Sequence, residues 1–306
     1  MKDAEAVSEP WEIDEDVFSW SIGVYTGDTP FDLKPAQEVQ NPVIAACNVS
    51  DVRAEFVADP FMIEADGAWH MFFEVMNSER RKGEIGLATS QDCLAWNYQR
   101  IILTEPFHLS YPHVFYLNGE HYMIPETYQA NSVRLYKADQ FPDRWTFIRS
   151  LLDGRWVDSS IVFFDEKWWM FTSSAEVEQD RLEVFYADAI EGPWRPHAMN
   201  PIIAADDRKA RPGGRMIVRD GKVIRFAQEG VPDYGMSVRA FEISELTVST
   251  YQEREVNHAP VLSAGTQNWH RGGMHHIDPH FVDGRWLACV DGWQYEPPTY
   301  SPSDPK

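Results

Sequence analysis

The 306-residue sequence predicts an all-β fold, a single five-bladed β-propeller. One observation is a hairpin pattern, two short strands joined by a tight turn, that recurs five times along the chain. A second, looser pair of strand-like segments follows each of the first four hairpins. The turn residues lie 52, 47, 55 and 63 positions apart, a period typical of a four-stranded propeller blade.

The first hairpin spans residues 58–74 and turns at Asp66-Gly67, a dipeptide typical of two-residue hairpin loops. The other four hairpins begin at Ser110, Val157, Pro212 and His275. Aligning all five hairpins places one turn residue in each: Asp66, Asn118, Asp165, Asp220 and Asp283. Each hairpin is expected to supply the two inner strands of a blade.

The fifth hairpin lacks the looser pair, because the chain continues into a Pro/Ser-rich tail. A similar segment begins instead at Ile22, near the other end of the sequence. We therefore expect N-terminal outer strands to pair with the C-terminal blade, which closes the ring and removes open sheet edges. The expected organisation is an acidic extension at 1–18, the propeller at 19–293 and the tail at 294–306.

The composition excludes several classes of partner. With 27 Lys+Arg against 48 Asp+Glu, the formal charge is −21, whereas nucleic acids and anionic membranes require a basic face. No apolar run is long enough for a transmembrane helix, and the acidic first residues do not resemble a secretory signal. Three scattered cysteines have no metal-ligand spacing. We expect a cytoplasmic protein.

Inner strands of a propeller begin at one mouth of its central channel, where small-molecule sites usually lie. The residues seven positions before each turn are Asp59, Tyr111, Asp158, Gly213 and His276. Buried carboxylates are costly without a partner or a task, so Asp59, Asp158 and His276 are candidate functional residues.

A second tier is expected at the same mouth, because each returning strand ends beside the start of the first. Its residues are Glu74, Glu126, Ser173, Gln228 and Asp291. Glu74 and Asp291 suit structural ion pairs between blades equally well. Other polar candidates near this mouth are His113, Arg211, Arg215, Glu229 and His275.

Asp on blade one, Asp on blade three and His on blade five resemble the pattern of the propeller glycosidases of glycoside hydrolase family 43. The resemblance implies that Asp59 is a general base and that Asp158 tunes the acid and orients substrate. It also implies that the His lies near a central cation or water. The acid of that family, a Glu on blade four, has no counterpart, because residues 211–215 read RPGGR.

Over nearly its whole length, the sequence also resembles the propeller domain at the N-terminus of plant glucosamine inositolphosphorylceramide transferases. The matching stretches include NPVI from Asn41, FVADPFM from Phe56, SYPHVF from Ser110, MIPET from Met123, ARPGGR from Ala210 and Tyr234-Gly235. That domain accompanies a separate glycosyltransferase domain. The resemblance therefore implies a carbohydrate-related pocket and a separate glycosyltransferase partner, not transferase activity.

A glycosidase needs a base that activates water and an acid that protonates the leaving oxygen. We expect Asp59 to be the base and Glu126, at the end of the second hairpin, to be the acid; Glu229 is the second candidate acid. Asp158 would tune the acid, and His275 or His276 would orient water or a ligand. The sequence thus predicts a glycoside hydrolase-like enzyme acting on a glycoside or sugar conjugate.

The alternative is a non-hydrolytic module that binds an acidic or phosphorylated glycan, or an enzyme with cyclase or lyase chemistry. Arg211 and Arg215 motivate it, since guanidinium groups match carboxylates and phosphates. Trp269 and Trp293 lie outside the Trp pattern of the repeat, and either could stack on a sugar. The expected substrate-binding residues are Tyr111, His113, Arg211, Arg215, Gln228, Glu229, His275, His276 and Trp293.

No cofactor is expected to be required. Residues 275–280 read HHIDPH, but strand alternation divides their ligand side chains between two faces. A Ca²⁺ ion held in the central channel is favoured over a catalytic transition metal, because the chain has a surplus of acid.

Overall fold

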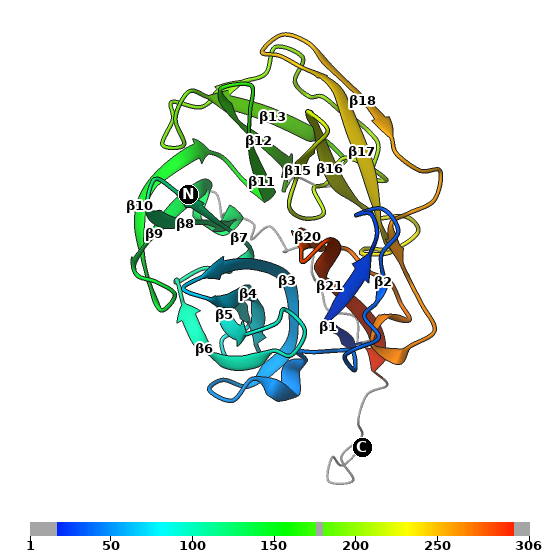
Figure 1. Cartoon of the computed structure of the whole chain (residues 1–306). Coiled ribbons are helices and arrows are strands. Elements are labelled where there is room, and N and C mark those ends of the chain that lie inside the picture. The colour runs from blue at the N-terminus through cyan, green and yellow to red at the C-terminus, as the bar shows by residue number, and fades with distance from the viewer. Residues whose placement is uncertain (1–16, 176–179, 297–306) are drawn as a thin grey trace, which may run out of the picture.

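The computed structural model describes residues 17–175 and 180–296, which form five antiparallel sheets around one axis (Figure 1). Blade one contains β3 (Ala54–Ala65), β4 (Ala68–Asn77), β5 (Lys82–Ser90) and β6 (Asn97–Leu103). Blade two contains β7 (Ser110–Leu117), β8 (Glu120–Glu126), β9 (Ser132–Gln140) and β10 (Arg144–Asp153). The predicted all-β five-bladed propeller is confirmed.

The remaining blades follow the same order from the axis outwards. Blade three contains β11 (Trp156–Phe164), β12 (Lys167–Ser174), β13 (Leu182–Ala187) and β14 (Arg195–Pro196). Blade four contains β15 (Ile217–Arg219), β16 (Lys222–Glu229), β17 (Ser237–Leu246) and β18 (Tyr251–Glu255), with β19 (Leu262–Ser263) beside β17. Blade five contains β20 (Ile277–Val282), β21 (Arg285–Glu296), β1 (Val17–Gly27) and β2 (Lys34–Pro35).

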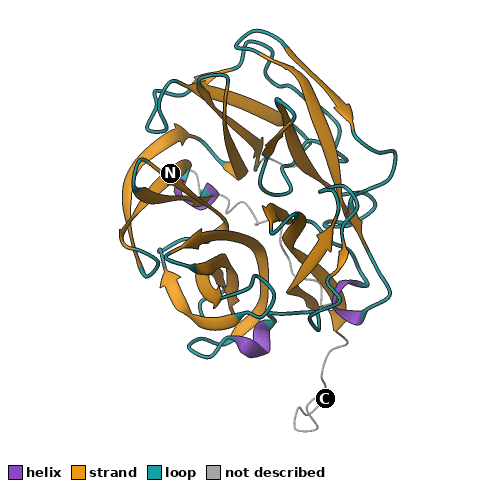
Figure 2. Ribbon diagram, viewed as in Figure 1, coloured by secondary structure: helices purple, strands orange, loops and turns teal. Residues whose placement is uncertain are grey.

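Short 3₁₀ turns provide the only helical elements of the described residues (Figure 2). They are η1 (Ala46–Asn48), η2 (Tyr128–Ala130) and η3 (Asn268–His270). No helix in this part of the chain is long and apolar enough to cross a membrane.

The five inner hairpins turn where the sequence pattern predicts. Every turn residue has a left-handed backbone, with φ between 49° and 53° at Asp66, Asn118, Asp165, Asp220 and Asp283. The residue after each also has positive φ, so all five are turns in which both central residues are left-handed. Four of these second positions are glycine, and blade three uses Glu166.

Blade five joins the two ends of the described chain. β1 pairs with β21 in an antiparallel register that runs from Val17 opposite Glu296 to Gly27 opposite Trp286. Ile22 and Val24 of β1 are fully buried in one cluster with side chains of blade one. The strands extend beyond the predicted limits of 19 and 293, and residues 1–16 and 297–306 lie outside the described part.

Side chains fill the central channel below its mouth. The Tyr111 hydroxyl from blade two lies 2.7 Å from Ser160 Oγ of blade three and accepts the Gly214 N–H of blade four at 2.6 Å. Phe61 from blade one packs edge-on against Tyr111 and His276, with ring centres 4.9 Å and 4.6 Å apart. The axis is therefore a packed core with a polar mouth.

An ion pair also joins the blades near this core. The Nε group of Arg215 on blade four donates to Asp278 Oδ1 on blade five, and Asp278 Oδ2 accepts the Met62 N–H of blade one at 2.7 Å. Arg215 further donates to the carbonyls of Val114 and Met62 at 3.1 Å and 3.2 Å. Asp278 is fully buried, and burial by itself would raise the pKa of its carboxyl. The charge of Arg215 outweighs this effect and keeps the pKa below its ordinary value.

We predict that Arg215→Met lowers the free energy of unfolding by about 3–5 kcal/mol, the usual cost of leaving one partner of a buried ion pair unpaired. Urea denaturation measures the change. The matched control is Arg219→Met, on the same blade, whose partner Asp220 is exposed; a surface pair contributes at most about 1 kcal/mol. If the two variants unfolded at the same urea concentration, that result would contradict the structural role of Arg215.

Candidate functional site

A bulge opens each of the first three inner strands at the mouth of the axis. The register shifts where β3 pairs with β4, β7 with β8 and β11 with β12, next to Asp59, Tyr111 and Asp158. These residues have left-handed backbones, with φ of 54°, 45° and 51°. Bulges redirect side chains and are common beside active sites. Spacing predicted which residues occupy the mouth, but not their left-handed conformation.

Buried carboxylates hold these bulges from the neighbouring blade. Asp291 Oδ2 accepts the Asp59 N–H at 3.0 Å, and Asp59 Oδ2 accepts the Tyr111 N–H at 3.2 Å. Glu126 Oε2 accepts the Asp158 N–H at 3.1 Å. Each carboxylate therefore fixes the bulge of the next blade. Asp291 of blade five holds blade one, Asp59 of blade one holds blade two, and Glu126 of blade two holds blade three.

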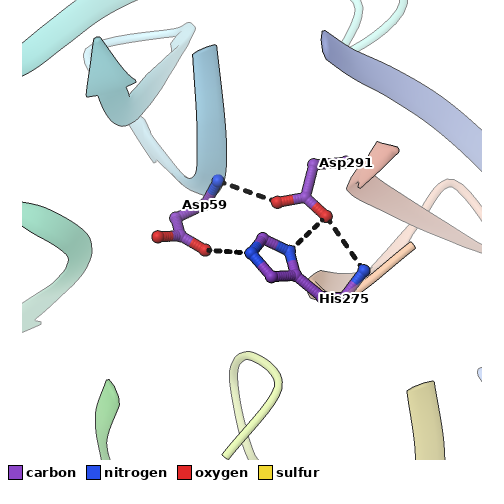
Figure 3. A group of neighbouring side chains, drawn as sticks. All are labelled: Asp59, His275 and Asp291. Atoms are coloured by element: carbon purple, nitrogen blue, oxygen red, sulfur yellow. Dashed lines mark hydrogen bonds and ion pairs between the residues drawn. The ribbon is translucent and has the colours of Figure 1, made fainter. Parts of the chain in front are cut away.

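Asp291 also positions an imidazole beside Asp59. Its Oδ1 accepts the backbone N–H groups of His275 and His276 at 3.2 Å and 3.0 Å and lies 2.8 Å from His275 Nδ1. The other ring nitrogen, His275 Nε2, lies 3.8 Å from Asp59 Oδ1 (Figure 3). Trp20 of β1 stacks on the His275 ring at 4.0 Å. The imidazole is thus held between two carboxylates and against an indole.

Blade four contributes a cation and an amide to this mouth. Arg211 Nε donates to Asp158 Oδ2, and Gln228 Nε2 donates to the same oxygen at 2.7 Å. The charge of Asp158 is therefore balanced within the protein. We call the buried polar groups at this mouth the axial cluster, whose members are Asp59, Glu74, Glu126, Asp158, Arg211, Gln228, His275, His276 and Asp291.

Three carboxyls of the axial cluster hold their protons unusually tightly. Burial, with further contributions from Asp158 and Asp291 and opposed by His275, raises the pKa of Asp59 to about 7. Burial and the neighbouring charge of Asp158 raise the pKa of Glu126 well above its ordinary value. Burial and Asp59 do the same for the pKa of Glu74. These carboxyls are 5% or 6% exposed, which explains why burial is the largest cause of each raised pKa.

The pKa values of the two histidines are shifted in opposite directions. Burial alone would lower the pKa of His275, but the charge and hydrogen bond of Asp291 raise it above its ordinary value. Burial lowers the pKa of His276 to about 4, so this ring is neutral at pH 7. Its Nε2 donates to the Pro60 carbonyl at 3.1 Å, which leaves Nδ1 as a buried acceptor 3.6 Å from Asp59 Oδ1.

Comparison with known protein families assigns the chain to one of them. A family described as "Glucosamine inositolphosphorylceramide transferase 1, N-terminal" matches residues 13–293. The chain belongs to this family. It is 36% identical to glucosamine inositolphosphorylceramide transferase 1 of Oryza sativa subsp. japonica, covering 90% of this chain and 40% of that protein. The corresponding protein of Arabidopsis thaliana is 35% identical, with 90% and 39% covered. The chain thus spans about two fifths of the length of these curated relatives.

This chain shares its fold with solved glycosidases. A putative glycosidase from Bacteroides thetaiotaomicron superposes with a TM-score of 0.62 at 13% identity, covering 86% of this chain and 97% of that one. The catalytic domain of a family 62 α-L-arabinofuranosidase from Coprinopsis cinerea gives 0.59 at 14% identity, with 91% and 98% covered. Identities this low establish the common propeller fold alone.

Several predicted site residues of this family member are already paired with other groups of the protein. Glu229, the second candidate acid, accepts hydrogen bonds from Ser237 and Arg239 at 2.7 Å and 2.9 Å, because its side chain turns toward the outer strand of blade four. Arg215 binds Asp278, as described above, and Arg211 pairs with Asp158. An acidic ligand would have to displace a buried carboxylate from either guanidinium, so the geometry does not favour the predicted anion clamp.

Two other predicted substrate contacts are packing residues. Trp293 is 2% exposed and donates from Nε1 to the Gly235 carbonyl at 3.0 Å, so neither face of its indole is presented to a ligand. His113 stacks on Phe61 at 4.9 Å, below the mouth. Trp269, the other candidate for sugar stacking, is also buried, at 5% exposure. The sequence spacing placed these residues near blade five or the axis. It did not show that neighbouring side chains cover the faces of their rings.

Tyr234 is an aromatic residue near the axial cluster that the sequence did not single out as a site residue. It is 44% exposed, lies against Arg211 with the guanidinium 5.0 Å from its ring centre, and packs edge-on to His275 at 5.2 Å. Its only signal in the sequence was Tyr234-Gly235 among the stretches that resemble the family. An exposed ring beside the axial cluster is suited to stacking on a sugar.

The donor set at the mouth fits a Ca²⁺ ion poorly. Asp59, His275 and Asp291 offer ligand atoms within 4.8 Å of one another. Ca²⁺ prefers six to eight oxygen ligands, whereas one of these donors is an imidazole. Asp291 Oδ1 already accepts two backbone N–H groups and bonds to His275. The oxygens of Asp291 are thus already used within the protein, and we assign no chemical step to a metal.

We predict that Asp59→Asn stabilises the protein at alkaline pH. A carboxyl whose folded pKa is raised to about 7 lowers stability progressively as pH rises from about 4 to 7. The variant should be more stable than the wild type at pH 8 by a few kcal/mol, since one pKa unit corresponds to about 1.4 kcal/mol. This difference should disappear near pH 4.

Urea denaturation between pH 4 and 8 measures the effect. The matched control is Asp66→Asn, which makes the same substitution in the exposed turn of the same hairpin and should change stability equally at every pH. A pH-independent difference between Asp59→Asn and the wild type would contradict the raised pKa of Asp59.

Proposed function

We propose that this chain is a carbohydrate-active propeller that hydrolyses a glycosidic bond, with Asp59 as general base and Glu126 as general acid. One observation carries the proposal: two buried carboxyls on adjacent blades meet at the mouth of the axis, each bonded to the backbone of the next blade, and both have a raised pKa. At neutral pH, a group with a pKa of about 7 can accept a proton while a group held well above its ordinary pKa donates one.

Each proposed role has a supporting contact. Asp59 would take a proton from the water that attacks the anomeric carbon, and Glu126 would protonate the leaving oxygen. Asp158 raises the pKa of Glu126 by its charge, after burial, and so keeps the acid protonated. Arg211 and Gln228 fix Asp158 in place. His275, held by Asp291, would orient water or a substrate hydroxyl beside Asp59.

The substrate class rests on similarity together with the site. The relatives are named for transfer of glucosamine to a lipid conjugate, and the structural neighbours include an arabinanase and an arabinofuranosidase. A glycoside or sugar conjugate is the class common to these names. A glycosyltransferase supplied by another chain, as a partner, is part of the same proposal, because the relatives extend well beyond the region matched here.

We predict that Asp59→Asn and Glu126→Gln each lower kcat by about 10²- to 10⁴-fold, the usual contribution of a general acid or base. Aryl furanosides and pyranosides provide the assay panel. Glu126→Gln should keep more activity on 4-nitrophenyl glycosides than on alkyl glycosides, because nitrophenolate leaves without protonation. Asp59→Asn should lose activity equally on both.

The matched control is Glu229→Gln, which changes a glutamate at the end of the same kind of inner strand but outside the axial cluster, and should retain full activity. Wild-type kcat/KM should rise as pH increases through about 7, because the base must lose its proton. Full activity of Asp59→Asn on a hydrolysed glycoside would refute the assignment of the base.

We also predict that Tyr234→Ala raises KM by up to about tenfold with little change in kcat, since aromatic stacking contributes about 0.5–1.5 kcal/mol. Tyr116→Ala is the matched control, because this tyrosine is 58% exposed at the turn end of its inner strand, away from the axial cluster. Equal KM values for Tyr234→Ala and the wild type would exclude Tyr234 as a sugar platform.

A further inference from the structure

A polar groove with a volume of about 1280 Å³ runs beside β1, separate from the axial cluster. Six carboxamide side chains line it, and we call it the amide groove; they are Gln37, Gln40, Asn41, Gln267, Asn268 and Gln294. Hydroxyls of Ser19, Ser21 and Thr266 complete its polar lining. The carboxamide of Asn41 bonds to the backbone of Val24, whereas most of the other amides and hydroxyls of the groove have no role in the fold described above.

β1 separates the amide groove from the axial cluster. Successive side chains of a strand point to opposite faces. Ser19 and Ser21 line the groove, whereas Trp20 between them stacks on His275. The groove is therefore a second site that shares a wall, but no side chain, with the first.

The amides retain hydrogen-bonding capacity for a ligand. Within the described residues, the carboxamides of Gln37, Gln40 and Gln294 form no hydrogen bond, and all three are exposed or half-buried. Gln267 and Asn268 use their oxygens to accept from Trp269 and Arg271 and keep their NH₂ groups. A carboxamide offers both donors and acceptors, as does a sugar hydroxyl.

The backbone of β1 adds a donor and an acceptor. Ile22 donates to the Ile44 carbonyl and accepts from the Val43 N–H, so its peptide groups point away from β21. Strand alternation directs the N–H and C=O of Trp20 to the same outer edge. β2 pairs only with Tyr25 and Thr26, further along β1. The loop at Val43 and Ile44 limits the unpaired edge to a few residues, too short for an added peptide strand.

The charge of the groove excludes an anionic ligand. Its lining has no lysine or arginine, and it contains two carboxylates, Glu38 and Glu55. Glu38 is paired with Arg285. A phosphate or carboxylate would thus meet two carboxylates and no cation in the lining itself, since Arg285 and Arg271 beside the groove are bonded to Glu38 and Asn268. A neutral polyhydroxylated chain matches both the amide donors and acceptors and the lack of positive charge.

We propose that the amide groove binds a neutral oligosaccharide. The proposal is independent of hydrolysis at the axial cluster, because it rests on a different set of side chains. Native gel electrophoresis in gels containing soluble arabinan, xylan or mixed-linkage β-glucan tests it, with retardation against polysaccharide concentration giving Kd. At least one of these neutral polysaccharides should retard the wild type, and anionic carboxymethyl-cellulose should not.

The triple variant Gln37→Ala/Gln40→Ala/Gln294→Ala should bind at least about tenfold more weakly, the loss expected for about 1.4 kcal/mol of hydrogen bonding. Gln140→Ala changes an exposed glutamine outside the groove and should bind like the wild type. Tyr234→Ala, which alters the axial site, should retain binding. Thermal unfolding followed by circular dichroism checks that every variant is folded.

Three results would overturn the proposal. The first is that no neutral polysaccharide retards the wild type. The second is that the triple variant and the wild type are retarded equally. The third is that Tyr234→Ala loses retardation while the triple variant keeps it. A protein that binds through the groove but hydrolyses no glycoside would refute only the proposed function, so the two hypotheses fail separately.

Discussion

The arrangement of the mouth depends on one constraint, the left-handed bulge that begins three inner strands. Each such residue costs about 1–2 kcal/mol relative to a right-handed backbone. A hydrogen bond to a carboxyl contributes about 0.5–1.5 kcal/mol when the carboxyl is neutral and about 1.5–3 kcal/mol when it is charged, which offsets much of that cost. Asp291, Asp59 and Glu126 supply these bonds to the next blade. The same carboxylates that could perform chemistry are therefore needed to hold the backbone that aims them.

This dual use determines the electrostatics of the axial cluster. Asp158 is balanced by Arg211, and Asp291 by His275, which leaves three buried carboxyls without a matching cation. Their protons cannot all leave in a low-dielectric site, since like charges this close repel strongly. In the family 43 pattern, blade four supplies the acid, whereas here it supplies Arg211. In the hydrolysis proposed above, the proton for the leaving group would therefore come from another blade, and Glu126 on blade two, beside Asp158, is the carboxyl with a raised pKa that would supply it.

The repeat in the sequence predicted the five blades, their turns and the residues at the mouth. Turn chemistry is local, so Asp66 and its counterparts fixed the alignment, and antiparallel pairing placed Glu74 and Glu126 at the same end. The direction of each long side chain was not predictable. Arg215 turns to Asp278, which lies 63 residues further along the chain, and Glu229 turns to Arg239 on the neighbouring strand of its own blade. Neither contact follows a period, and the bulges also interrupt it.

β1 connects closure of the ring to both candidate sites. Its pairing with β21 holds the strand that carries Asp291, the partner of His275, and brings Trp20 onto the His275 ring. The same alternation turns Ser19 and Ser21 into the amide groove. Loss of β1 pairing would therefore release the indole that fixes His275 and remove one wall of the groove together. A strand that closes a propeller is usually considered for stability alone, but here three consecutive residues place it in the geometry of two polar sites.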